Sequence, residues 1–266
     1  MTDNRKAIFF DVDGTLWDKE EKIPPSTIKA IHQLQTNGHL AFICTGRTRA
    51  FFKDERLLSI GFDGIVSGCG TTVEYGGEDL FYLKLTNEAI REALPVLRSH
   101  HIQPVMEGRY DIYLDKEDFA DPGFLALLEH DSHGHVISLS DNFDRWEASK
   151  MTVVTSHCVG DDMDQVMKKL GHLYDFKVHH FGIAEMVPKG YHKGSGIQIV
   201  CDHLGIPIED TIAVGDGPND LDMLRMAGTG VAMGNATEDA KAAADYVTAD
   251  LHEAGIWKAC EHLGLL

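Results

Sequence analysis

Four aspartates could form a metal-assisted catalytic site, because each follows closely on a short apolar run: Asp11, Asp13, Asp216 and Asp220. A buried strand seldom ends in acids for packing reasons, since each carboxylate must be desolvated or paired. Four carboxylates at one edge of a sheet would repel one another unless a cation bound them, and oxygen-only ligands suit Mg²⁺. Solvated loop acids are the alternative interpretation, and for Asp220 a helix N-cap is another.

A second set of residues offers hydrogen-bond donors for a phosphoryl group. Thr45 and Gly46 follow the apolar run at residues 40–44. Asn219 lies where a short helix should begin, and Lys193 lies just before another helix. Donors gathered around a metal suit a phosphoryl group, whose spread negative charge is met by a cation and N–H groups. Taken singly, Thr45 could belong to a simple turn and Lys193 could be a surface charge.

The elements that must position these residues alternate between strand and helix. Apolar runs typical of buried strands occur at residues 7–10, 40–44, 64–66, 211–214 and 230–233. Strands that alternate with helices predict an α/β fold with a Rossmann-like parallel sheet. Ligands of such sheets bind at the carboxyl ends of the strands. The candidate residues fall at those ends.

A stretch of different character interrupts this pattern. From about Thr72 onwards the sequence predicts hairpins and strands around helices at residues 87–100 and 161–171, without regular alternation. This pattern predicts a self-contained α+β domain inserted into the core. The predicted boundaries are 1–84 for the first part of the core domain, 85–187 for the inserted domain and 188–266 for the second part of the core.

The composition argues against some partners and places. The 266 residues carry a formal net charge of −18, which argues against nucleic acid and anionic membranes, since both need a positive surface. None of the five cysteines forms a C-x-x-C pair, which favours free thiols in a reducing compartment. Acids at positions 11 and 13 interrupt the first apolar run too early for a signal peptide, and no stretch is long enough to span a membrane. We therefore expect a cytoplasmic protein.

Competing motifs for phosphate or metal are incomplete. A P-loop sequence, G-x-x-x-x-G-K-[ST], does not occur. Val73 stands where a dinucleotide fingerprint beginning at Gly68 needs its third glycine, and Gly14 comes too early for an EF-hand loop. The histidines at positions 130, 133 and 135 could bind a metal, although an exposed loop is the simpler interpretation.

Together the motifs resemble those of the haloacid dehalogenase-like hydrolases, and the match covers nearly the whole chain. Four motifs stand in the family's order: Asp-Val-Asp-Gly-Thr at 11–15, Thr-Gly-Arg at 45–47, Lys193, and Gly-Asp-Gly-Pro-Asn-Asp at 215–220. The insertion resembles the C2B cap of the Cof-type branch, as does the run at residues 187–194. Lys189 is a rival for the motif lysine, but Lys193 is followed directly by glycine and an amphipathic helix.

The resemblance implies a two-step phosphoryl transfer. Asp11 would attack phosphorus and form an aspartyl-phosphate. Asp13 would protonate the leaving alkoxide and then take a proton from the hydrolytic water. A dehalogenase does not need this second acid, so Asp13 favours phosphate chemistry.

The resemblance also implies a set of binding residues. Mg²⁺ would be held by a carboxylate oxygen of Asp11, the backbone carbonyl of Asp13 and the carboxylate of Asp216, while Asp220 would act directly or through water. The phosphoryl oxygens would be held by Thr45, Gly46, Lys193 and Asn219. Arg47 could face either this site or the cap.

We therefore predict a Mg²⁺-dependent phosphatase that acts, as a monomer or a homodimer, on a small phosphorylated metabolite such as a sugar phosphate. The rivals are a phosphomutase of the same fold and a non-enzymatic ligand-binding protein. A mutase cap should carry extra Arg or Lys for a second phosphate, whereas this insertion is rich in Asp, Glu and His. Candidate cap residues that select the substrate are Glu107, Arg109, Tyr110 and Trp146.

Overall fold

The chain folds into two compact units. The structure, a computed structural model, describes residues 5–119, 121–179 and 182–266. Unit 1 comprises Met1–Gly46, Asp54–Phe81 and His192–Leu266. Unit 2 comprises Arg47–Lys53 and Tyr82–Tyr191.

Unit 1 is built on an eight-stranded sheet with the order β14-β13-β12-β1-β2-β3-β4-β5. The strands are β1 (Ala7–Phe10), β2 (Leu40–Cys44), β3 (Gly64–Ser67), β4 (Thr72–Tyr75), β5 (Glu78–Tyr82), β12 (Thr211–Gly215), β13 (Thr229–Ala232) and β14 (Tyr246–Val247). All six strands from β14 to β3 run parallel, and β4 pairs antiparallel with β3. The residues of β1 and β2 are all buried, as expected of a parallel sheet covered on both faces. The predicted parallel α/β core is confirmed.

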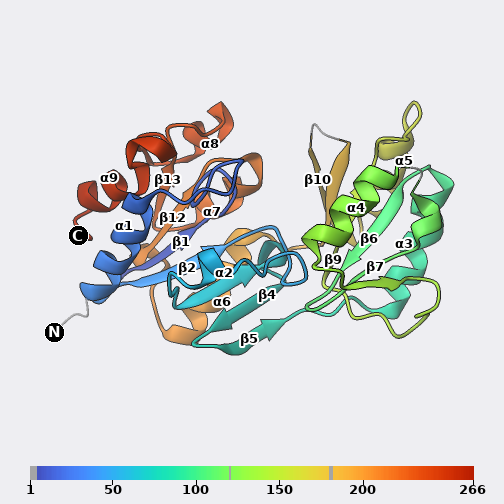
Figure 1. Cartoon of the computed structure of the whole chain (residues 1–266), viewed down its shortest axis with the longest axis horizontal. Coiled ribbons are helices and arrows are strands. Elements are labelled where there is room, and N and C mark those ends of the chain that lie inside the picture. Colours follow the sequence, from blue (N-terminus) through green and yellow to red (C-terminus); the bar gives the residue numbers. More distant parts are fainter. Residues whose placement is uncertain (1–4, 120, 180–181) are drawn as a thin grey trace. The chain divides into compact units, whose positions relative to one another are not determined.

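The helices of unit 1 alternate with its strands along the chain (Figure 1). The helices are α1 (Pro25–Thr36), α2 (Glu55–Leu58), α6 (Lys193–Leu204), α7 (Leu221–Met226), α8 (Glu238–Ala243) and α9 (Gly255–His262). Helix α1 packs against α9, and α7 contacts both α6 and α8. Among the described residues, no helix has both the length and the apolar character that a membrane span requires.

Unit 2 contains a six-stranded sheet with the order β10-β11-β9-β6-β7-β8. Its strands are β6 (Gln103–Glu107), β7 (Ile112–Leu114), β8 (Val136–Ser138), β9 (Lys150–Val154), β10 (Tyr174–His179) and β11 (Ile183–Pro188), and its helices are α3 (Asn87–Ser99), α4 (Pro122–Asp131) and α5 (Asp162–Leu170). Most neighbouring strands are antiparallel; only β7 and β8 are parallel. This is the α+β character predicted for the insertion.

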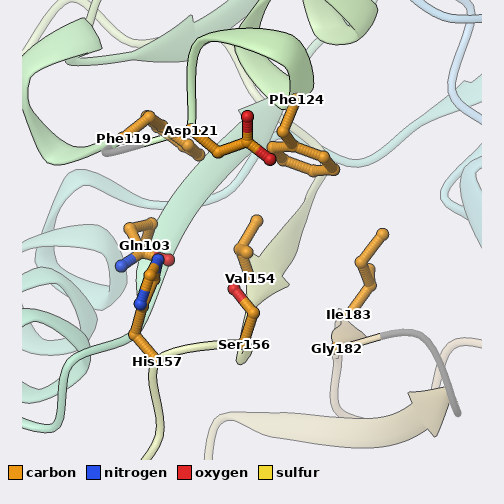
Figure 2. A pocket seen from close by; sticks show the side chains of 9 residues that line it. All are labelled: Gln103, Phe119, Asp121, Phe124, Val154, Ser156, His157, Gly182 and Ile183. Carbon is orange, nitrogen blue, oxygen red and sulfur yellow. The ribbon is translucent and has the colours of Figure 1, made fainter.

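The two faces of this second sheet carry different cores. Met106, Met151 and Met186 lie side by side on β6, β9 and β11, in the core that α3 and α5 complete. Val105 belongs to the core on the other face, to which α4 contributes Leu128. Beside α4 on that face lies a cavity of about 190 Å³ (Figure 2).

The division of the chain differs from the predicted boundaries in one substantial respect. Residues 47–53 belong to unit 2, although the sequence pattern assigned them to the core. The reason is local packing: Ala50 is buried in the cluster of Val105, and Thr48 donates a hydrogen bond to Glu107. The other changes of unit fall at 81/82 and 191/192, within a few residues of the predicted 84/85 and 187/188.

Candidate active site

The parallel register of β1 and β12 brings the motif acids together at one edge of the sheet of unit 1. Phe10 pairs with Val214, so the residues that follow both strands emerge side by side. The N–H group of Asp11 donates to the carbonyl of Val214 at 2.9 Å, which extends the ladder by one residue. Carboxylate oxygens of Asp11, Asp216 and Asp220 lie within 4.8 Å of one another.

Lys193 lies inside this cluster. Its Nζ donates to Oδ1 of Asp11 at 2.5 Å and to Oδ1 of Asp220 at 2.6 Å, and its side chain is 0% exposed. A buried ammonium needs such partners, because burial alone disfavours its charge. Burial acts to lower the pKa of Lys193, but the two carboxylates outweigh it and raise that pKa well above its ordinary value.

The start of helix α6 fixes the position of Lys193. His192 is the N-cap: its ring accepts from the N–H of Ser195, and the Ser195 hydroxyl accepts from the N–H of His192. This reciprocal pair is a capping box, and it holds the first turn that Lys193 begins. The rival Lys189 lies in unit 2, where it pairs with Asp175 at 3.1 Å.

Both carboxylate oxygens of Asp220 accept hydrogen bonds from other residues of the site. Oδ1 accepts from Lys193, and Oδ2 accepts from the N–H groups of Asp216 and Gly217, each at 2.8 Å. The side chain is fully buried. Asp220 therefore orients Lys193 and the loop that carries Asp216. The alternative interpretation of Asp220 as a side-chain N-cap of α7 is not supported, because its carboxylate accepts no hydrogen bond from the first turn of that helix.

Asp216 is held by residues of the first motif. The hydroxyl of Thr15, to which sequence analysis assigned no role, donates to Oδ1 of Asp216 at 2.8 Å. Burial, together with the neighbouring charge of Asp220, raises the pKa of Asp216 to about 6. Burial also raises the pKa of Asp11 well above its ordinary value, and repulsion from Asp220 adds to this effect while Lys193 opposes it. The raised pKa values indicate that the negative charge of the carboxylates in this site exceeds the positive charge that Lys193 supplies.

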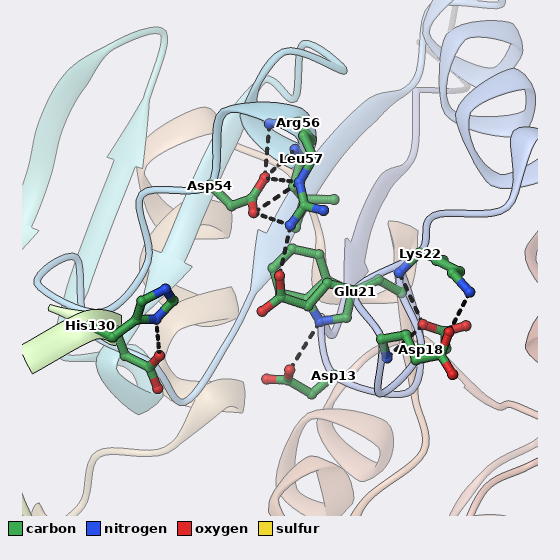
Figure 3. A network of polar contacts seen from close by, with 11 residues as sticks. Asp13, Asp18, Glu21, Lys22, Asp54, Arg56, Leu57 and His130 are labelled. Atoms are coloured by element: carbon green, nitrogen blue, oxygen red, sulfur yellow. Dashed lines mark hydrogen bonds and ion pairs between the residues drawn. The ribbon is translucent and has the colours of Figure 1, made fainter. Parts of the chain in front are cut away.

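Asp13 differs from the other acids because its side chain is exposed. Its Oδ1 accepts a hydrogen bond from the indole Nε1 of Trp17 at 2.9 Å (Figure 3). Further along the same loop, Glu21 pairs with Arg56 at 2.7 Å, so the loop is attached to α2 as well (Figure 3). Asp13 therefore stands at the surface of the site and Asp11 inside it.

The predicted donors lie at different depths. Thr45 is buried; its N–H donates to the carbonyl of Val66 at 2.8 Å and its carbonyl accepts from Cys69 at 3.2 Å. Gly46 is buried and Asn219 is half-buried. Arg47 is half-buried and belongs to unit 2.

Two of the four candidate selectors in the insertion are not surface residues. Trp146 is fully buried and its Nε1 donates to the carbonyl of Leu139 at 2.8 Å, so its ring is part of the core of unit 2. Glu107 is 1% exposed and lies 3.4 Å from the Nζ of Lys150. Arg109 packs over the ring of Tyr110, whose side chain is 59% exposed. Of the four, only Arg109 and Tyr110 reach the surface of unit 2.

Comparison with known proteins identifies the family to which the chain is similar. The family model for haloacid dehalogenase-like hydrolases matches residues 8–260. The protein named "Putative phosphatase YkrA" of Bacillus subtilis (strain 168) is 33% identical, with 98% of both chains covered. The 5-amino-6-(5-phospho-D-ribitylamino)uracil phosphatase YitU of the same organism is 27% identical over 94% of both chains. Among solved structures, the HAD subclass IIB sugar phosphatase BT4131 matches with a TM-score of 0.84 and 30% identity, over 98% of this chain and all of the other.

Proposed function

Because the chain belongs to the haloacid dehalogenase-like hydrolases and is a phosphatase of that family, we propose that it hydrolyses a small phosphorylated metabolite through an aspartyl-phosphate on Asp11, with Mg²⁺ as cofactor. The observation that carries the proposal is the buried cluster of Asp11, Asp216, Asp220 and Lys193 at the carboxyl edge of the sheet. The alternative of a non-enzymatic binding protein does not need a buried nucleophile beside a lysine.

The donor set of the cluster fits Mg²⁺. Three carboxylates face one ammonium, so the four groups together carry −2 when all are ionised. Carboxylate oxygens of Asp11 and Asp216 and the main-chain carbonyl of Asp13 would hold the ion. Asp220, whose oxygens accept hydrogen bonds from Lys193 and from the N–H groups of Asp216 and Gly217, would act on the ion directly or through water. When bound, the ion would supply positive charge to a phosphoryl oxygen.

Asp11 is the proposed nucleophile. One carboxylate oxygen would form a bond to phosphorus while the bond from phosphorus to the leaving oxygen breaks. Lys193, at 2.5 Å from Oδ1 of Asp11, favours the ionised form that this attack requires. Thr45, Gly46, Asn219 and Lys193 are the proposed donors to the phosphoryl oxygens.

Asp13 is the proposed acid and base. Its exposed carboxyl group would give a proton to the departing alkoxide, and the carboxylate would then take a proton from the water that attacks the aspartyl-phosphate. The hydrogen bond from Trp17 would fix the orientation of this side chain between the two steps.

The substrate is proposed to be a sugar phosphate or a similar ester. The 30% identity to a sugar phosphatase over 98% of the chain supports this class, and the name of YitU shows that a relative at 27% identity acts on a larger phosphorylated compound. We also place the protein in the cytoplasm, because all five cysteines are free. Arg47 is a further residue proposed to bind the substrate.

Hydrolysis of p-nitrophenyl phosphate tests the proposal. Activity should require Mg²⁺, stop with EDTA, and fall by at least about 10³-fold in Asp11→Asn, because an amide is not a nucleophile of comparable strength. Asp202→Asn is the matched control, an exposed acid on helix α6. Normal turnover by Asp11→Asn would refute the nucleophile assignment. Release of isomerised sugar phosphate without free phosphate would identify a mutase instead.

A further inference from the structure

Unit 2 contains a candidate binding site in which none of the residues discussed above takes part. It is the cavity of about 190 Å³ beside helix α4 (Figure 2). It is lined by the apolar side chains of Phe119, Phe124, Val154 and Ile183 and by the polar side chains of Gln103, Asp121, Ser156 and His157. We propose that this cavity binds a single aromatic or heteroaromatic ring that carries an amino group.

The apolar walls have the size and shape for one ring. Phe119 and Phe124 stack with ring centroids 6.2 Å apart and an interplanar angle of 22°. Val154 and Ile183 are directly paired on β9 and β11, so they share one face of the sheet (Figure 2). A cavity of about 150 Å³ is enough for benzene. A volume of about 190 Å³ therefore accommodates one substituted ring rather than a nucleotide-sized ligand.

Two of the four polar side chains that line the cavity, those of Gln103 and Asp121, offer hydrogen-bond acceptors, while Ser156 and His157 can each donate or accept. The Asp121 side chain lines the cavity together with Phe119 and Phe124 (Figure 2), and its Oδ1 accepts from the N–H group of Gly123 at 2.8 Å. The amide oxygen of Gln103 is buried and accepts no hydrogen bond from the described residues, while its Nε2 donates to the carbonyl of His101 at 3.4 Å. A buried acceptor without a donor is unfavourable, so an N–H group that enters the cavity would be stabilised there.

The charges of the lining side chains favour a ligand with an amino group over an anionic ligand. Asp121, an exposed residue, is the one acid among the described residues that line the cavity; His157 is the one basic side chain there, and neither Lys nor Arg is among them. A phosphate or carboxylate would therefore meet a like charge, whereas an ammonium would meet an opposite charge beside two aromatic rings. The cavity thus differs in chemistry from the acid cluster of unit 1, where a phosphoryl group is expected.

The test measures binding of small probes to the full chain by amide NMR spectroscopy. Benzylamine should bind saturably in the millimolar range and shift the amides of Val154 and Ile183. Benzyl alcohol should bind more weakly, and benzoate should not bind. Asp121→Asn should weaken benzylamine binding by about fivefold to tenfold, because the charge-assisted bond is lost. Asparagine remains an effective N-cap, so α4, whose Gly123 N–H bonds to Asp121, should stay folded.

The matched control is Asp161→Asn, which changes the N-cap acid of α5, outside the cavity, and should leave binding unchanged. Phe124→Leu keeps an apolar side chain but removes one ring, and should also weaken binding. The proposal is wrong if benzoate binds as well as benzylamine, or if Asp121→Asn binds like the wild type. Because these measurements need no turnover, they are independent of the proposed phosphatase chemistry.

Discussion

At the scale of single residues, Lys193 is the group on which the active-site cluster depends. It is the cation that lies between Asp11 and Asp220, and all three side chains are nearly or completely buried. Removing one partner from a buried ion pair is far more costly than removing an exposed pair, because the remaining charge stays desolvated. Both folding and catalysis should therefore respond to changes at Lys193.

Lys193→Met should abolish hydrolysis and lower the free energy of unfolding by about 3 kcal/mol, since two buried carboxylates lose their shared cation. Chemical denaturation and p-nitrophenyl phosphate turnover measure the two effects. Lys189→Met is the control: its pair with Asp175 is largely exposed and should contribute less than about 1 kcal/mol. Equal losses in the two variants would contradict the central role of Lys193.

The raised pKa of Asp216, about 6 in place of 3.8, has a consequence for stability. The folded protein binds more protons than the unfolded chain between these two values, so this group's contribution to the free energy of unfolding falls as the pH rises through that window. Asp216→Asn removes the contribution. In EDTA, the stability of Asp216→Asn relative to wild type should therefore increase from pH 4 to pH 6.

Saturating Mg²⁺ should change the stability of the wild type relative to that of Asp216→Asn. An ion bound to the carboxylate favours its ionised form, so Mg²⁺ should stabilise the wild type above pH 6 and stabilise Asp216→Asn much less. Denaturation midpoints with Mg²⁺ and with EDTA give the difference. A variant that Mg²⁺ stabilises as much as the wild type would exclude Asp216 as a ligand.

At the scale of elements, the loop after β1 is shaped by a close approach to the loop after β12. Gly14 adopts φ +91°, and a Cβ there would lie 2.3 Å from Oδ2 of Asp216. Only glycine tolerates both the dihedral angle and the contact. The glycine of the first motif therefore has a steric function at the junction of the two loops.

Comparing Gly14→Ala with Gly38→Ala separates the effect of the positive φ angle from the effect of the close contact with Asp216. Gly38 has almost the same φ, +92°, but nothing lies within 4 Å of its hypothetical Cβ. Both variants should lose about 1 kcal/mol of stability from the strained dihedral angle. Only Gly14→Ala should also lose Mg²⁺ affinity and most of its activity. Full activity in Gly14→Ala would show that Asp216 can move without loss of function.

At the scale of the whole molecule, each unit has its own core and its own buried lysine. In unit 2, the Nζ of Lys150 lies 2.9 Å from Glu185 and 3.4 Å from Glu107, and the hydroxyl of Thr152 donates to Glu107 at 2.5 Å. These charges lie within the sheet of unit 2, so they stabilise that unit rather than the acid cluster of unit 1. The two units should therefore respond separately to mutation.

Lys150→Met should destabilise unit 2 by about 3 kcal/mol, because Glu107 and Glu185 keep their burial but lose the Lys150 ammonium group. Hydrogen exchange should show faster exchange in β6, β9 and β11 and little change in β1 and β12. Lys116→Met, which removes an exposed partner of Glu129, is the control. Equal acceleration in both units would mean that they unfold as one.

The sequence by itself determined the parallel core, the inserted α+β unit and the residues of the acid cluster, because these follow from local patterns. Apolar runs that end in Asp11 or Asp216 specify both a strand and its edge, and parallel pairing then brings the two edges together. Pairings between distant residues carry no such local signal. Tertiary structure alone decided that Asp220 uses both oxygens on Lys193 and the Asp216 loop, that Thr15 bonds to Asp216, and that Trp146 is buried. The cavity beside α4 likewise exists only because strands and a helix far apart in the sequence pack together, and packing, unlike strand periodicity, depends on every neighbour at once.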